Sequence, residues 1–195
     1  MPGGTGKKTA GPGGGLRNTL WRPPNGLYLS GQVYPIRTDL HTALTFAAMA
    51  KAGTLTEEGF YRLWFPAEHP KDLEQALEAV GAFYRQGRPR QESGPQAYDL
   101  FTDAGPIFAA FRRHYGMDLN TAGDMHWWHF LGLLEGLITH SFSQRVSYRV
   151  GDLKGLSPEE RAEVLRYRAL YRLDGEEESL EEHLQNLQRL AKRGK

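Results

Sequence analysis

One stretch near the middle of the chain, residues 124–138, constrains the fold more than any other. Its sequence is Asp-Met-His-Trp-Trp-His-Phe-Leu-Gly-Leu-Leu-Glu-Gly-Leu-Ile, and its apolar side chains surround nearly the whole circumference of a helix. A helix that is apolar on all sides is normally buried at the centre of a domain. The run is interrupted by His126, His129 and Glu135, and it is shorter than the about 20 mostly apolar residues of a membrane span. We therefore expect a central buried helix at about residues 124–138.

The expected start of this central helix is Asp124, whose carboxylate can accept hydrogen bonds from the amides of the first turn. Gly136 would let a neighbouring element approach closely, because it has no side chain. The candidate core residues share large apolar side chains and lie on this helix and on the helix before it: Trp127, Trp128, Phe130, Leu131, Leu134, Phe111 and Phe108.

Three more helices are expected between residues 38 and 84. Thr38 is a suitable N-cap for the first and Thr56 for the second, while Pro70 is the expected first residue of the third. Apolar residues in the third recur at i, i+3, i+4, i+7 and i+10, which is the pattern of an amphipathic helix.

The second half of the chain carries further helix signals. Thr102 is the expected cap of a helix that ends at Gly116, and residues 142–150 fit either a helix or a strand, of which we favour the helix. Ser157 and Glu160 form a capping box with proline at the first helical position. The apolar positions of the helix that follows this box are Ala162, Leu165, Ala169 and Leu170.

A β-hairpin is expected near the N-terminus. Residues 27–29 and 33–36 are two short β-runs around a turn that contains Gly31. Pro35 restricts the second run to an edge or an end of a sheet, and an isolated hairpin is only marginally stable. The predicted fold class is therefore mainly α: a small helical domain with a short N-terminal β-hairpin packed on its helices.

Both ends of the chain differ in composition from the middle. Residues 1–22 are rich in Gly and Lys and contain no acid, and residues 1–15 cannot bury enough apolar surface to fold, so we expect a flexible arm over residues 1–22. Residues 23–174 form the expected helical domain, and residues 175–195 the expected C-terminal amphipathic helix. The stripe of this last helix is the candidate partner-binding surface: Leu180, Leu184, Leu187 and Leu190. Such a stripe could equally pack back on the domain.

Composition excludes several classes of protein. The chain has no cysteine, so it has no disulfide and no thiolate metal site. We find no signal peptide and no membrane span, and we expect a protein of the cytoplasm. The formal net charge is +1, and the short arginine clusters are diluted by acids, which argues against nucleic acid as a partner.

No catalytic, cofactor-binding or metal-binding residue can be assigned, and we expect a protein that is not an enzyme and has no cofactor. His126 and His129 are three residues apart and would share one side of a helix, so a metal-dependent enzyme is one alternative. The simpler interpretation places both histidines at the edge of an aromatic core. Neither a phosphate-binding glycine loop nor a nucleophile elbow is present.

Several runs of the sequence together resemble one known family. They are Gly-Gln-Val-Tyr-Pro-Ile-Arg-Thr-Asp-Leu at 31–40, Leu-Trp-Phe-Pro at 63–66, Ala-Phe-Tyr at 82–84, Ile-Phe-Ala-Ala-Phe at 107–111, Tyr-Gly-Met-Asp-Leu at 115–119, Met-His-Trp-Trp-His-Phe at 125–130, Leu-Leu-Glu-Gly-Leu at 133–137 and Tyr-Arg at 148–149. The chain resembles, from about residue 27 to 173, the phage gene-product-fifteen family, whose genes lie in the tail region of long-tailed phages and prophages.

The resemblance implies a tail-assembly chaperone. Such a protein would bind the tape-measure protein in the host cytoplasm before tail tube subunits polymerise, and would be absent from the mature virion. A companion tail chaperone and the tail tube protein are further candidate partners. The family offers no catalytic residues to transfer to this chain. An alternative is a structural adaptor of the tail or neck that is retained in the virion.

Overall fold

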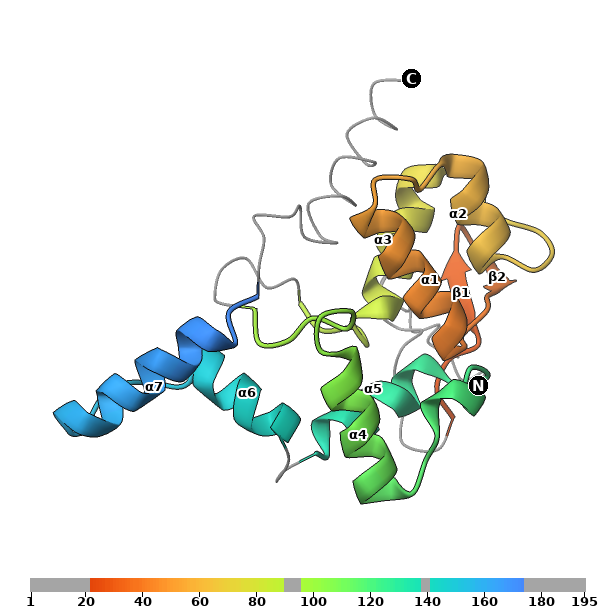
Figure 1. Ribbon diagram of the computed structural model, residues 1–195. Coiled ribbons are helices and arrows are strands. Elements are labelled where there is room, and N and C mark those ends of the chain that lie inside the picture. The colour runs from red at the N-terminus through yellow and green to blue at the C-terminus, as the bar shows by residue number, and fades with distance from the viewer. Residues whose placement is uncertain (1–21, 90–95, 138–140, 174–195) are drawn as a thin grey trace, which may run out of the picture. The chain divides into compact units, whose positions relative to one another are not determined.

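The computed structural model describes residues 22–89, 96–137 and 141–173 (Figure 1). It is mainly helical with one antiparallel hairpin near its start, which confirms the predicted fold class. The described residues fall into two compact units, each drawn from separate parts of the chain. Unit 1 contains residues 22–37 and 56–89, and unit 2 contains residues 38–55, 96–137 and 141–173. Residues 1–21 of the expected arm and the terminal stripe of Leu180, Leu184, Leu187 and Leu190 lie outside the described residues.

The hairpin in unit 1 is formed by β1 (Gly26–Leu29) and β2 (Gln32–Pro35). Its two turn residues, Ser30 and Gly31, both have positive φ, at 50° and 87°, as a tight two-residue hairpin turn requires. Leu27 and Leu29 point into the core of unit 1, whereas the opposed pair of Tyr28 and Val33 is exposed.

Two helices complete unit 1: α2 (Glu57–Trp64) and α3 (Leu73–Tyr84). The hydroxyl of Thr56 accepts a hydrogen bond from the amide of Gly59, so this predicted cap is confirmed. The predicted start of α3 at Pro70 is wrong. The carboxylate of Asp72 accepts from the amide of Gln75 at 3.2 Å, and this side-chain cap fixes the helix start at Leu73, three residues later.

Unit 2 begins with α1 (Leu40–Lys51), whose cap is Asp39 instead of the predicted Thr38. The carboxylate of Asp39 accepts from the amide of Thr42 at 2.8 Å and from its hydroxyl at 2.9 Å. The carbonyl of Thr38 is already occupied, because it accepts from the amide of Trp127 at 2.7 Å. Thr38 therefore belongs to the segment that joins α1 to a later helix.

The helix α4 (Ala104–Tyr115) starts after Asp103, so the predicted cap at Thr102 is off by one residue. Asp103 makes no capping hydrogen bond with its side chain, because its carboxylate is bound by an arginine described below. The helix ends at Gly116, which has φ of 67° and is the predicted C-terminal glycine. A short 3-10 turn, η2 (Leu119–Thr121), follows.

The central helix α5 (Trp127–Glu135) is shorter than the predicted stretch of residues 124–138, and its cap is His126 instead of Asp124. Nδ1 of His126 accepts a hydrogen bond from the amide of Trp128 at 3.1 Å. The helix cannot begin earlier because the preceding backbone pairs with the start of α1: the amide of Leu40 donates to the carbonyl of Met125 at 2.7 Å. His126 also forms an isolated β-bridge with Asp39.

The aromatic core of unit 2 lies around α5. The candidate core residues that are buried are Trp127, Trp128, Phe130, Leu134 and Phe111, while Leu131 and Phe108 are half-buried. The ring of Phe130 stacks on Phe111 at 5.3 Å and on Trp127 at 5.5 Å between centroids. One side of α5 is nevertheless exposed at His129, Gly132 and Glu135, so the helix is not buried on all sides as its composition suggests.

The last two described helices are α6 (Ser141–Val150) and α7 (Pro158–Leu170), which pack against each other. The helix favoured for residues 142–150 is confirmed. The capping box before α7 is confirmed as well, since Ser157 and Glu160 each accept a hydrogen bond from the other's amide. Of the helices described, none is long and apolar enough to cross a membrane.

Candidate functional site

The candidate site in unit 2 is the outward surface of α7, and a buried ion pair holds the helix in place. Asp103 is fully buried, and the side chain of Arg149 on α6 is 5% exposed. Two guanidinium nitrogens of Arg149 donate to the two carboxylate oxygens of Asp103, at 2.5 and 2.9 Å. This two-pronged geometry is the strongest form of the arginine–carboxylate interaction.

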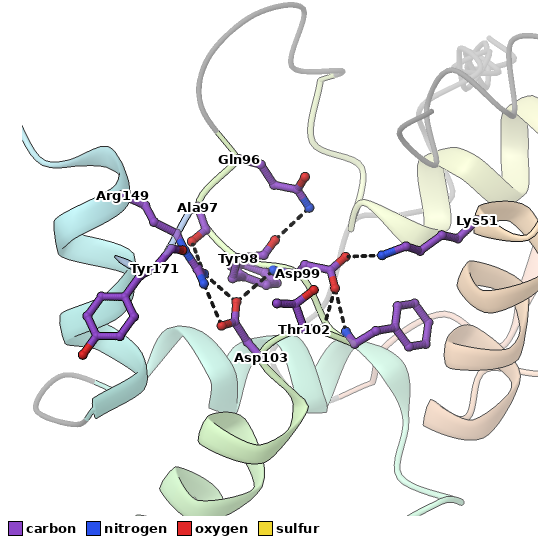
Figure 2. A network of polar contacts seen from close by, with 10 residues as sticks. Lys51, Gln96, Ala97, Tyr98, Asp99, Thr102, Asp103, Arg149 and Tyr171 are labelled. Carbon is purple, nitrogen blue, oxygen red and sulfur yellow. Dashed lines mark hydrogen bonds and ion pairs between the residues drawn. The ribbon is translucent and has the colours of Figure 1, made fainter. Parts of the chain in front are cut away.

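Arg149 also binds two backbone carbonyls (Figure 2). Its Nε donates to the carbonyl of Tyr171 at 2.5 Å, and its Nη1 donates to the carbonyl of Ala97 at 3.2 Å. The side chain therefore joins three segments of unit 2: the loop before α4, the end of α6 and the residue that follows α7. Removing either partner of such a buried pair would leave an uncompensated charge in the interior, so each of the two side chains depends on the other.

The loop before α4 is fixed at a second point, Asp99 (Figure 2). Its carboxylate accepts from the amides of Phe101 and Thr102 at 3.0 and 2.6 Å and lies 3.7 Å from the ammonium group of Lys51 at the end of α1. Burial alone would raise the pKa of Asp99, but these hydrogen bonds and the charge of Lys51 outweigh burial and lower it. The loop is therefore tied both to α1 and to α6.

The contacts between α7 and α6 are mainly aromatic and basic. Tyr148 of α6 stacks on Tyr167 of α7 at 4.6 Å between ring centroids, and Tyr167 stacks on Tyr171 at 5.9 Å. Arg168 donates to the carbonyl of Tyr148 at 2.8 Å, while Arg145 lies 4.8 Å from the centre of the Tyr171 ring. These contacts orient α7 so that its other face points away from α6.

That other face carries four exposed aliphatic residues of α7, which we call the α7 stripe: Ala162, Leu165, Ala169 and Leu170. The remaining aliphatic residue of the helix, Val164, is half-buried. Within the stripe, Leu165 is exposed by 44% and Leu170 by 68%, and α7 has no buried residue. The sequence pattern makes these positions the apolar face of the helix, yet the helix packs through its tyrosines and Arg168. A contiguous exposed apolar stripe of this kind is typical of a surface that binds another protein segment.

The two central histidines do not form a metal site with their neighbours. Nδ1 of His126 is used as the cap of α5, and His129 is exposed, with 5.5 Å between the two ring centroids. Throughout the described part of the chain, no group of three or more His, Asp or Glu side chains is arranged to hold a metal ion.

Sequence reasoning missed the Asp103–Arg149 pair. The two residues are 46 positions apart, and no local pattern connects them. The sequence offers only one signal at Asp103: it lies directly before a helix that contains Pro106 in its first turn. An acidic residue in that position suggests a helix cap and gives no indication of an ion pair. The terminal leucines proposed from the sequence as the partner-binding surface lie outside the described residues.

Comparison with known proteins gives one match. Residues 24–173 match a protein-family model described as Bacteriophage Gp15 protein, and this match includes nearly all of the described residues of both units. No curated protein and no solved structure matches the chain.

Proposed function

We propose, because the chain belongs to the bacteriophage Gp15 protein family, that it is a tail-assembly chaperone that binds the tape-measure protein before tail tube subunits polymerise around it. The role is not enzymatic and is carried out in the cytoplasm of the bacterial host. The tape-measure protein is the main partner, and a companion chaperone and the tube protein are further partners of the same process.

The observation that carries this proposal is the exposed α7 stripe. A tape-measure protein is a very long helical chain with apolar stripes that aggregate when uncovered. Covering such a stripe requires a second apolar helix surface of similar width. In α7, Leu165 supplies a large side chain between Ala162 and Ala169, and the two alanines allow a partner helix to approach closely.

The chemistry of the stripe also suits temporary binding. Two of its four side chains are alanines, which bury little area each, so the gain per contact is modest. The residues beside the stripe include Glu159, Arg161 and Arg166, which are exposed and can set the orientation of a partner without a large contribution to affinity. A modest affinity is what a chaperone needs if tube subunits are to displace it.

Co-purification with the tape-measure protein from the same tail-gene region tests the proposal. We expect the full chain to capture the tape-measure protein, and Leu165→Glu to lose most of this capture because it places a charge in the middle of the stripe. The matched control is Val33→Glu, which introduces the same charge at an exposed apolar position of unit 1. Capture that survives Leu165→Glu, or that is lost equally in Val33→Glu, would contradict the role of the α7 stripe.

A further inference from the structure

We propose that the α7 stripe binds a second copy of itself: two copies of the chain associate through α7 helices that run antiparallel to each other. The pairing does not depend on the proposed function. Only its consequence does, namely that the tape-measure protein must displace the second copy in order to bind α7.

The surface that would be paired is the side of α7 opposite to α6. Figure 1 shows α7 packed on α6, and none of its residues is buried. Ala162, Leu165 and Ala169 follow one another at intervals of three and four residues, so they lie along one line of the helix. Tyr167, which stacks on Tyr148, points to the other side. An exposed seam with this spacing is what a second helix covers in a coiled coil.

The exposed charges beside the seam are ordered along the helix. Glu159 and Glu163 lie in the N-terminal half and Arg166 in the C-terminal half, all on the same side of the seam. Among the residues that the structure describes, none forms an ion pair with these three. Two identical antiparallel helices bring the same side of each together, with the acidic half of one copy against the basic half of the other. The charges of α7 are therefore complementary to themselves in this orientation.

One antiparallel register brings the apolar positions together. In it, Ala162 of each copy lies opposite Leu165 of the other, and Pro158 lies opposite Ala169. Each leucine thus faces an alanine, which allows the two helices to approach closely without a gap. Arg161, which is exposed on the other side of the seam, lies along Leu165 of the second copy and can cover it with its aliphatic part.

The same register also pairs the charges. Arg166 of one copy lies between Glu159 and Glu163 of the other copy, and two-fold symmetry repeats this arrangement. The two copies of Glu163 lie beside the symmetry axis, and each is flanked by an arginine from both copies. The side of the contact that carries these residues therefore has acids and arginines in alternation instead of like charges in a row.

The length of the contact determines its strength. α7 has 13 residues and is therefore about 20 Å long. Contacts that bury less than about 1,200 Å² in total are typical of weak or transient association. We therefore expect a dimer that forms at high concentration and that a partner can displace.

Sedimentation velocity of the full natural chain gives the first test, and it needs no substitution. We expect a monomer at about 1 µM and mainly a dimer at about 500 µM, as for a weak and small interface. A monomer at both concentrations would overturn the pairing.

An exchange of charges between two variants tests the antiparallel register. Arg166→Glu leaves only acids on the paired side of both helices, and the double variant Glu159→Arg, Glu163→Arg leaves only arginines there. We expect each variant alone to dimerise at least about tenfold more weakly than the natural chain, because like charges then meet. Mixed in equal amounts, the two variants place acids against arginines, so the dimer should return. The matched control is Arg113→Glu, which changes an exposed arginine of α4 and should dimerise like the natural chain.

Two outcomes of the exchange would overturn the pairing: a dimer that Arg166→Glu leaves intact, which places the contact elsewhere on the chain, or a mixture that stays monomeric while thermal melts show both variants folded. A variant that merely lost its fold would not regain the dimer on mixing. These readouts need no tape-measure protein. Absence of the dimer with normal tape-measure capture refutes only the pairing, whereas a dimer without capture refutes only the proposed function.

Discussion

Removing the guanidinium of Arg149 should loosen the α6–α7 pair and destabilise unit 2. Arg149→Ala removes four hydrogen bonds, two of them to a carboxylate that has no exposed surface. Asp103 keeps the amide of Asp99 as a donor but loses the charge that balances its own. Breaking one side of a buried ion pair costs about 3–5 kcal/mol, and we expect a loss of that size in the free energy of unfolding.

The matched control is Arg112→Ala, which breaks another arginine–aspartate pair of unit 2. Arg112 lies 2.7 Å from Asp118, but the two side chains are 59% and 35% exposed. Water screens such a pair, and exposed pairs contribute at most about 1 kcal/mol. Arg149→Lys should fall between the two alanine variants, because lysine keeps the charge but cannot make the two-pronged contact.

Two measurements detect the loss of stability in these variants. Urea unfolding gives the free energy for each variant, and hydrogen exchange shows where protection is lost. In Arg149→Ala, we expect amides of α6 and α7 to exchange faster while those of α2 and α3 in unit 1 do not change. The reasoning is refuted if Arg149→Ala costs no more than Arg112→Ala, or if the loss of protection is as large in α2 and α3 as in α6 and α7.

Three further predictions follow from the same structure and sequence. Trp128→Ala should cost about 3–5 kcal/mol in urea unfolding because the ring is buried, and a loss below about 1 kcal/mol would contradict its place in the core. The lowered pKa of Asp99 stabilises the fold above the unfolded-state pKa of about 3.9, and this contribution is lost as the pH falls through the folded-state value. Acid melts of Asp99→Asn should therefore show a smaller loss of stability below about pH 4 than the natural chain, and parallel curves would exclude this role. Deleting residues 1–15 should leave the melting temperature unchanged, since their composition cannot support a core, and a fall of several degrees would show that the arm packs.

Local signals in the sequence were sufficient to predict turns and helix ends whose conformation depends on residues nearby in the chain. Ser30 and Gly31 predict the hairpin turn, Gly116 the end of α4, and Ser157 with Glu160 the start of α7. Each of these depends on residues within one turn of the chain. These features and the fold class could therefore be predicted without any long-range contact, whereas the predicted starts of α1, α3 and α4 were off by one to three residues.

Features that depend on distant residues could not be predicted. The start of α5 is set by backbone pairing with Leu40, which prevents a helix at Asp124 even though the local composition favours one. Asp103 serves as a partner of Arg149 instead of capping α4 with its side chain, and no spacing rule connects the two. The sequence also predicts which residues of α7 form its aliphatic face, but it does not predict that this face is exposed. Only the packing of Tyr167 on α6 shows which face remains open.

The central claim, a chaperone that acts before the tail is complete, is tested most directly by quantitative mass spectrometry of the phage at two stages. The tape-measure protein would be isolated from infected cells before tube assembly and from purified virions, and the amount of this chain would be measured relative to it. We predict that the chain accompanies the tape-measure protein in the cell extract and is absent from the virion. The same ratio of chain to tape-measure protein in both samples would contradict the chaperone and identify a structural adaptor of the tail or neck.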